Sequence, residues 1–142
     1  MKKYQFIFKM AVVALASSSF MLNAKISVVV NHQAQVSALS KTDLADIFLE
    51  KIGSYSSNEK LTPVDQRPNA VRAFFYERVL GKSNAEMKAY WSREIFTGHS
   101  YPPREVEGDE GVIAAVASNP SYVGYVNSTA ADSRVKVVAS VD

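Results

Sequence analysis

The sequence contains no cysteine, and its 142 residues include only two histidines and one tryptophan. Without cysteine the chain can form neither disulfides nor thiolate zinc sites, and it has no thiol to carry a lipid, so stability must come from packing. The acidic pairs along the chain lack histidine partners and the spacing of a calcium loop. We therefore expect no metal site and no cofactor.

Catalytic motifs are also missing. The sequence has no glycine-rich phosphate loop and no G-x-S-x-G elbow. His99 and Ser100 are adjacent, but neighbours in sequence rarely face each other, so a serine–histidine hydrolase is the weakest interpretation. We expect no catalytic residues and a protein that is not an enzyme.

The N-terminus has the pattern of an export signal. Lys2 and Lys3 precede an apolar run over residues 10–22, and Asn23-Ala24 follows it, which is the order of charged region, apolar region and cleavage site. The run is shorter than the roughly 20 residues needed to cross a bilayer. We predict a signal peptide at residues 1–24, no membrane anchor, and one domain at residues 25–142 that works outside the cytoplasm.

Removal of the signal changes the charge of the chain. The signal holds three lysines and no acidic residue, so 16 basic residues become 13 against 14 acidic ones. Binding to nucleic acid or to an anionic membrane surface would need a clustered basic excess. We therefore exclude both as partners.

The remaining 118 residues predict a single α/β domain. Short β-branched runs predict strands, and capping residues before apolar positions at helical spacing predict helices. The predicted elements are strand 26–30, helix 40–49, edge strand 61–65, helix 69–80, helix 83–98, an extended segment 101–104, a helix from 109 or 110 to 118, and strands 122–126 and 135–138. They indicate a small mixed sheet flanked by helices. At helical spacing, Tyr90, Trp91 and Phe96 are expected in the core.

Residues 64–69 form the most suggestive local feature, because they lead from a strand into a helix start. The free N–H groups of such a start attract anions, and Arg67 or Arg72 could add a charge-assisted hydrogen bond. The alternative is that Arg72 pairs with Asp65 or Glu77 on the surface. We take Arg67, Asn69 and Arg72 as candidate ligand-binding residues.

A second candidate site lies earlier in the chain. Ser37 and Ser40 could supply neutral donors at the start of the helix that begins at residue 40, and Asn31 ends the first strand. We add Asn31, Ser37 and Ser40 to the ligand-binding candidates.

Four segments resemble the phosphate-type periplasmic substrate-binding proteins of ABC transporters, particularly their short, single-lobe relatives. They are residues 40–52, similar to the family's helix and "IFxGKI" turn; residues 64–66 with 72–75; residues 90–98 with Pro102-Pro103; and Val123-Gly124-Tyr125-Val126, similar to "IGYV". The four segments occur in the family's order and span most of residues 25–142.

The resemblance implies a type II periplasmic-binding-protein fold of about one lobe and a periplasmic module that recognises a small anion such as phosphate, with an ABC transporter. Two departures stand out. The family's Ser-Gly-Thr cluster at the second helix start is replaced by residues 67–72, and Glu50 replaces a glycine. The alternative is a regulatory domain that keeps the fold without transport and binds a membrane sensor or transporter component.

Overall fold

The computed structural model describes residues 25–51 and 60–142 as alternating strands and helices. The elements in chain order are β1 (Ile26–Val30), α1 (Lys41–Phe48), β2 (Thr62–Gln66), α2 (Ala70–Phe75), a π-helical segment η1 (Tyr76–Leu80), α3 (Asn84–Thr97), β3 (Arg104–Val106), α4 (Gly108–Ser118), β4 (Tyr122–Asn127) and β5 (Lys136–Val141). The predicted signal peptide lies outside the described residues. No helix among the described residues is long and apolar enough to cross a membrane.

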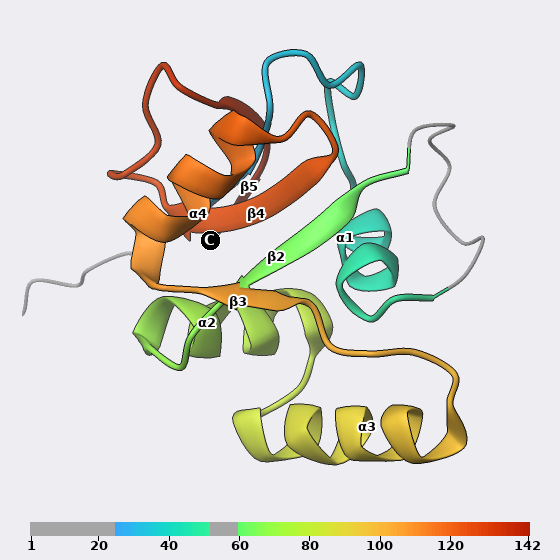
Figure 1. Cartoon of the computed structure of the whole chain (residues 1–142). Coiled ribbons are helices and arrows are strands. Elements are labelled where there is room, and N and C mark those ends of the chain that lie inside the picture. The colour runs from blue at the N-terminus through green and yellow to red at the C-terminus, as the bar shows by residue number, and fades with distance from the viewer. Residues whose placement is uncertain (1–24, 52–59) are drawn as a thin grey trace, which may run out of the picture.

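The five strands form one mixed sheet in the order β3-β2-β4-β1-β5 (Figure 1). β1 pairs antiparallel with β4 and with β5, whereas β2 runs parallel to β3 and β4. The parallel strands are joined through helices, as parallel pairs require. This arrangement confirms the predicted α/β fold with a small mixed sheet.

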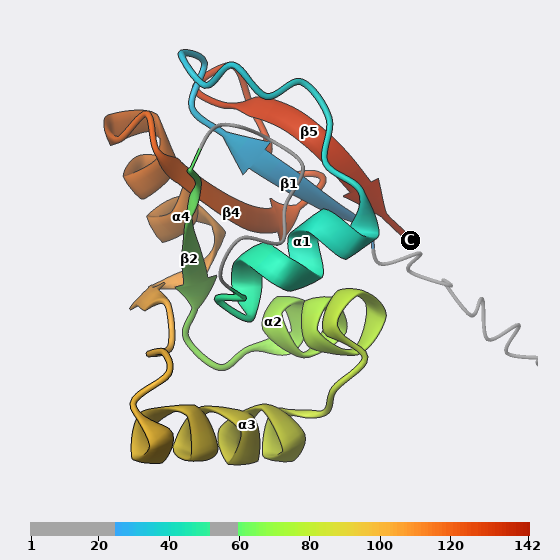
Figure 2. The same cartoon turned by 90° about the vertical axis from the view of Figure 1, so that its right-hand side faces the viewer.

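Helices cover both faces of the sheet, and this explains the apolar run of β1, which only Ser27 interrupts. Val28 and Val30 join the core cluster beneath α1, α2 and α3, whereas Val29 joins a second cluster with Val112 and Val116 of α4. Figure 2 shows α4 on one side of the sheet and α1 and α2 on the other. All five residues of β1 are therefore buried.

The helix starts follow the sequence signals closely. Ser40 and Ser83 each form a full capping box, with Asp43 and Glu86 as the returning carboxylates. Asn69 caps α2 by accepting a hydrogen bond from the Arg72 N–H at 2.8 Å. These local rules work because each cap satisfies backbone donors that the first turn leaves free.

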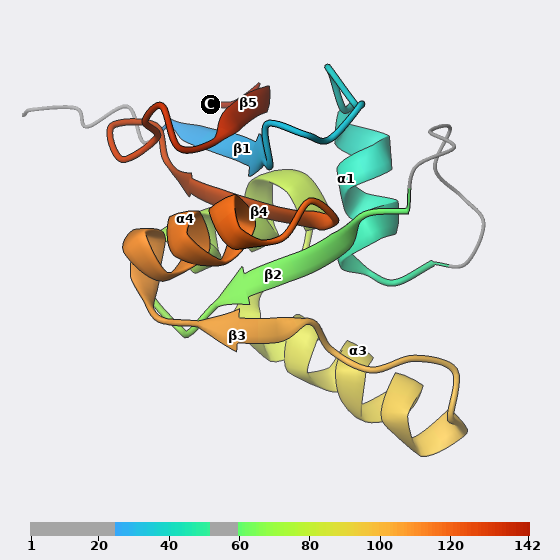
Figure 3. The same cartoon turned by 45° about the horizontal axis from the view of Figure 1, so that its top comes forward.

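The expected element order lacked one strand, β3. Residues 104–106 begin at the last residue of the segment predicted as extended, and they pair in parallel with Val64 to Gln66 (Figure 3). A run of Arg-Glu-Val carries no apolar alternation, so its pattern does not distinguish a strand from a loop. Only the backbone partners offered by β2 decide its conformation.

The prediction that residues 61–65 form an edge strand is wrong, because β2 lies between β3 and β4. The expectation rested on Pro63, which has no N–H to donate. The Thr62 N–H bonds to Ser121 O on the β4 side at 2.7 Å. Because the N–H groups of successive residues in a strand point to opposite sides, the nitrogen of Pro63 faces β3. There the pairing with β3 begins only at Val64, and no donor is needed at Pro63.

Two helix predictions also need correction. The helix expected from 69 to 80 changes after Phe75 into the π-helical turn η1, which ends at Gly81 with a left-handed φ of 63°. In α3, Met87 and Trp91 are buried, but the Phe96 side chain is 91% exposed. Phe96 therefore does not belong to the core, because it follows Met87 by nine residues and, at about 3.6 residues per turn, lies on the opposite face of α3.

Glu50 has an unusual backbone conformation for a side chain with a Cβ. Its φ is 53°, and the bonds from Glu50 N to Ile47 O and from Lys51 N to Asp46 O complete a Schellman motif after α1. Glycine is the usual residue at this position of the motif. The left-handed backbone at position 50 therefore explains why the family that the sequence resembles has glycine at this position.

Replacing Glu50 by glycine is expected to stabilise the chain. The Glu50→Gly variant relieves the left-handed strain, and after the cost of a more flexible unfolded chain about 0–1 kcal/mol of unfolding free energy remains as gain. Burial raises the pKa of Glu50, against the nearby charge of Lys60, so a second source of stabilisation is removal of the carboxylate. Urea unfolding of Glu50→Ala, which keeps the Cβ, separates the two: an equal gain in both variants would contradict the backbone explanation.

Candidate functional site

The junction between β2 and α2 gathers most of the polar side chains of interest. β2 ends at Gln66, the chain turns through Arg67 and Pro68, and Asn69 begins α2. β3 runs beside this end of β2, so Glu105 and Glu107 reach the same place from a distant part of the sequence. The carboxyl ends of parallel strands are where α/β proteins usually build sites.

Gln66 is the centre of this junction and is fully buried. Its Nε2 donates to Asp109 Oδ1 and to the backbone carbonyl of Tyr125, both at 2.8 Å, and its Oε1 accepts from Asn69 Nδ2 at 2.7 Å. The side chain thereby links β2, α4, β4 and the cap of α2. A buried amide with all these partners fixes the position of the helix start.

Asp65 is a buried carboxylate held by two tyrosines. The hydroxyls of Tyr76 and Tyr125 donate to its two oxygens, and the Gln66 N–H donates to Oδ1 at 2.8 Å. Burial raises the pKa of Asp65, while the bonds from Tyr125 and Tyr76 and the charge of Arg72 oppose the rise. Burial and the nearby Asp65 raise the pKa of both tyrosines, so they remain protonated donors.

Arg72 lies against this cluster with its side chain only 16% exposed. Nη1 donates to the Gln66 carbonyl at 2.9 Å and to Glu105 Oε1 at 2.8 Å, and the guanidinium lies over the Tyr76 ring, with Cζ 4.8 Å from the centroid. Nε is buried and finds no hydrogen-bond partner within residues 25–51 and 60–142. Arg72 is thus a largely buried cation with an unused donor.

The other arginine candidate, Arg67, sits at the rim. Its Nη1 contacts Glu107 Oε2 at 3.2 Å, and both side chains are well exposed. An exposed pair of this kind contributes little to stability. Arg67 can therefore exchange Glu107 for another anion at small cost, which distinguishes it from Arg72.

The three candidates from the earlier part of the chain do not lie in this cluster. Asn31 is buried, and its Nδ2 donates to the carbonyls of Val116 and Ala117 at 3.0 Å, where it caps the end of α4. Ser40 uses its hydroxyl to cap α1, and Ser37 is exposed in the preceding loop. The structure brings Arg67, Asn69 and Arg72 together, and it leaves Asn31, Ser37 and Ser40 elsewhere.

His99 and Ser100 do not form a catalytic pair in this geometry. The Ser100 hydroxyl donates to Glu94 Oε2 at 3.2 Å, and His99 Nδ1 contacts Thr97 Oγ1 at 3.1 Å. A nucleophilic serine would instead need its hydroxyl bonded to the histidine. Within the described part of the chain, no three histidine or acidic side chains are grouped to hold a metal ion.

A groove lies beside Arg72, between α3 and the β2–α2 turn. It has a volume of about 430 Å³, and Arg72 and Glu105 stand at one wall while Met87, Lys88 and Trp91 of α3 form the other. We call it the α3 groove. Glu50 does not reach it and lines a different hollow with Thr62 and Tyr101, so its carboxylate is kept away from Arg72.

Sequence reasoning missed Asp65, Gln66, Tyr76, Glu105 and Tyr125 as members of the cluster. A signal was present, since Asp65-Gln66 closes an apolar strand with two polar residues that turn out to be buried. No sequence signal marked Tyr76 and Tyr125, because tyrosines within a helix and a strand are ordinarily expected to pack in the core. Glu105 could be placed only once β3 was known to pair with β2.

Several solved structures with a similar arrangement are described as phosphate-transport or phosphate-binding proteins. A protein from Clostridium perfringens described as a phosphate ABC transporter substrate-binding protein, solved with bound phosphate, matches with a TM-score of 0.62 and 19% identity over 81% of this chain. An ABC-type phosphate transport receptor from Vibrio cholerae matches with a TM-score of 0.59 and 18% identity, also over 81%. PstS from Borrelia burgdorferi gives 0.53 and 10% over 82%.

The chain has the phosphate-type substrate-binding-protein fold. The resemblance carried by the four sequence segments is thus confirmed at the level of the fold. The chain spans about half the length of these neighbours, 45% of the first, 46% of the second and 47% of the third. No protein-family model matches it, and no curated protein sequence does.

Proposed function

We propose that this chain is a solute-binding module that recognises a small oxyanion such as phosphate at the junction of β2 and α2. The observation that carries the proposal is Arg72, a largely buried cation whose Nε has no partner among the described residues. Asn69 and Arg67 flank it, and a guanidinium offers the paired donors that oxyanions accept. The fold it shares with phosphate-transport proteins supports the same function.

Glu105 defines how this site would work. Its carboxylate accepts a hydrogen bond from Arg72 Nη1 in the structure. An incoming oxyanion must therefore displace the Glu105 carboxylate from Arg72. Glu105 is about half exposed and can turn toward solvent, which makes it an internal stand-in for the ligand. The binding roles predicted for Asn31, Ser37 and Ser40 lie apart from this site and stay predictions.

The decisive experiment is calorimetry of residues 25–142 with inorganic phosphate and sulfate, on the wild type and on Glu105→Gln. The variant is expected to bind about tenfold more tightly, because the competing charge beside Arg72 is gone. Glu107→Gln is the matched control, since Glu107 pairs with Arg67, and a much smaller change is expected there. No heat from either anion at millimolar concentration, in wild type and Glu105→Gln alike, would reject the proposal.

We further propose that the chain is exported through its N-terminal signal, acts in the periplasm and works with a membrane component of an ABC transporter. The signal rests on the sequence pattern of residues 1–24. The neighbours named as phosphate-transport proteins support the transporter connection.

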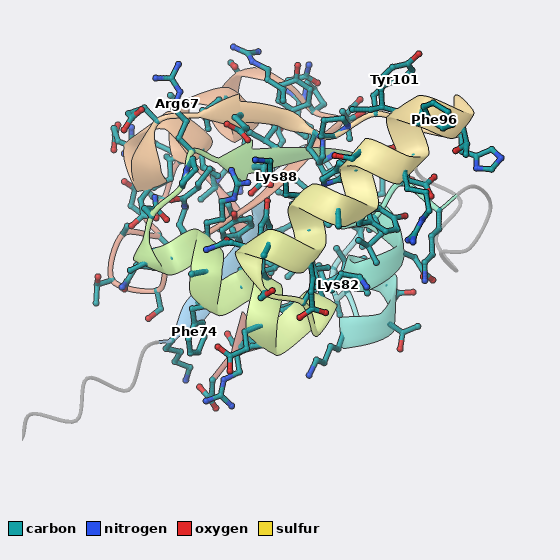
Figure 4. All side chains as sticks on the ribbon, turned by 90° about the horizontal axis from the view of Figure 1, so that it is seen from below. Arg67, Phe74, Lys82, Lys88, Phe96 and Tyr101 are labelled. Carbon is teal, nitrogen blue, oxygen red and sulfur yellow. The ribbon has the colours of Figure 1, made fainter. Side chains whose placement is uncertain are left out.

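A second candidate function is the regulatory or interaction domain, which the exposed apolar end of α3 favours. Ile95, Phe96 and Tyr101 are 47%, 91% and 68% exposed, and Figure 4 places Phe96 and Tyr101 together at this end. Exposed apolar groups that cluster in this way commonly mark protein contacts. The surface would contact a membrane sensor or transporter component.

A pull-down from membrane extracts tests this second function. The double variant Phe96→Ser/Tyr101→Ser is expected to lose a partner that the wild type retains, while binding phosphate unchanged. Val137→Ser is the control, because Val137 is a similarly exposed apolar residue on β5. Equal recovery by all three proteins, or no partner for the wild type, would contradict it.

A further inference from the structure

The α3 groove has two chemically different halves. Six of its residues form a stripe along α3 at helical spacing, namely Asn84, Met87, Lys88, Trp91, Ser92 and Ile95. Pro68 and Pro102 face this stripe from the turns after β2 and before β3. Met87 and Trp91 are largely buried at the floor of the groove, and Ile95, Pro68 and Pro102 supply its exposed apolar surface. The groove thus joins an apolar surface to the charged wall that Arg72 forms.

Positive charge predominates among the groups that line the groove. Arg72 and Lys88 are its cations and Glu105 is its one carboxylate, already paired with Arg72 Nη1. Lys88 is exposed and lies on the side of α3 nearer Arg67, whereas Lys82 lies on the opposite side (Figure 4). An anionic group placed beside Arg72 therefore also feels Lys88.

An inorganic oxyanion would use only half of this groove. The apolar walls offer an inorganic oxyanion no hydrogen bonds. A flat apolar group that covers these walls would remove apolar surface from water, which favours binding. The volume of about 430 Å³ lies within the range of about 300–1,000 Å³ that small-molecule sites occupy. The shape and the lining both fit a molecule larger than phosphate.

We propose that the α3 groove binds an organic oxyanion, a phosphate or carboxylate that carries a flat apolar group. The headgroup meets Arg72 and Lys88, and the apolar group packs on Ile95 and Pro102, beside the accessible edge of Trp91. The inference rests on the proposed oxyanion site at Arg72 and adds the class of ligand. Binding of such an organic ligand would depend on α3, whereas binding of an inorganic anion at Arg72 would not.

The test compares phenyl phosphate, inorganic phosphate and phenol by calorimetry while Trp91 fluorescence is recorded. Trp91 is the single tryptophan of the chain, so its emission reports on the groove directly. Phenyl phosphate is expected to bind at least about tenfold more tightly than either half alone and to change the Trp91 emission saturably. Lys88→Ala is expected to weaken phenyl phosphate about two- to fivefold, and Lys82→Ala to leave it unchanged.

Each other outcome has a definite meaning. Equal affinity for phenyl phosphate and inorganic phosphate without a change in Trp91 emission overturns this inference and leaves the proposed function standing. Absence of binding by every anion overturns both. Phenol as tight as phenyl phosphate removes the charged half of the proposal. A stable dimer that Lys88→Glu dissociates assigns the groove to a second copy of the chain and also overturns it.

Discussion

The Asp65→Ala variant is expected to lose about 3–5 kcal/mol of unfolding free energy. In the folded chain the carboxylate accepts hydrogen bonds from the hydroxyls of Tyr76 and Tyr125 and from the Gln66 N–H. Truncation leaves the two buried tyrosine hydroxyls without their acceptor and leaves the Gln66 N–H only a long bond to Tyr125 Oη at 3.4 Å. Each buried donor left without an acceptor costs about 1–3 kcal/mol before local rearrangement. Thermal unfolding followed by circular dichroism should show the melting temperature falling by more than about 10 °C.

A double-mutant cycle distinguishes lost hydrogen bonds from a simple cavity. In a Tyr76→Phe/Tyr125→Phe background, Asp65→Ala should cost much less, because two of the orphaned donors are already gone. A cost that is the same in both backgrounds would contradict the assigned role of the tyrosines. Asp65→Asn is expected to fall between wild type and Asp65→Ala, since the amide retains one acceptor.

Arg72→Ala is expected to weaken oxyanion binding by about 1.5–3 kcal/mol, or roughly 10- to 150-fold. The loss follows from removing a cation whose side chain is largely buried and whose Nε has no partner among the described residues. Calorimetry with phosphate on both proteins gives the ratio. Arg72→Lys should bind with intermediate affinity, because an ammonium keeps the charge but cannot present paired donors.

The control for this experiment is Arg93→Ala, which removes an exposed arginine of α3. It is expected to change neither affinity nor stability appreciably. Because Arg72 also bonds the Gln66 carbonyl, circular dichroism must show that Arg72→Ala is folded at the temperature of the titration. A folded Arg72→Ala protein that binds phosphate like the wild type would remove Arg72 from the site.

Sequence signals were most accurate where the hydrogen-bond partners of a helix end lie within the same short stretch of chain. The capping boxes at Ser40 and Ser83, the cap at Asn69 and the glycine stops at Gly81 and Gly98 all place helix ends through contacts within five residues. The first family-like segment contains such a local feature, the capping box at Ser40. Gly124, in the fourth segment, meets a tertiary requirement instead, because a Cβ there would overlap Val112 of α4.

The sequence by itself determined the four α-helices and four of the five strands that the structure describes, and the strand-to-helix junction that holds Arg67, Asn69 and Arg72. Only the tertiary structure decided that β3 adds to β2, that Glu105 therefore reaches Arg72, and that Asp65 is shared by tyrosines 11 and 60 residues away. The physical reason is the separation along the chain over which each interaction acts. Caps and periodicity act over a turn or two of chain, whereas a buried charge or an unpaired strand selects its partners from any segment that the fold brings within hydrogen-bonding distance.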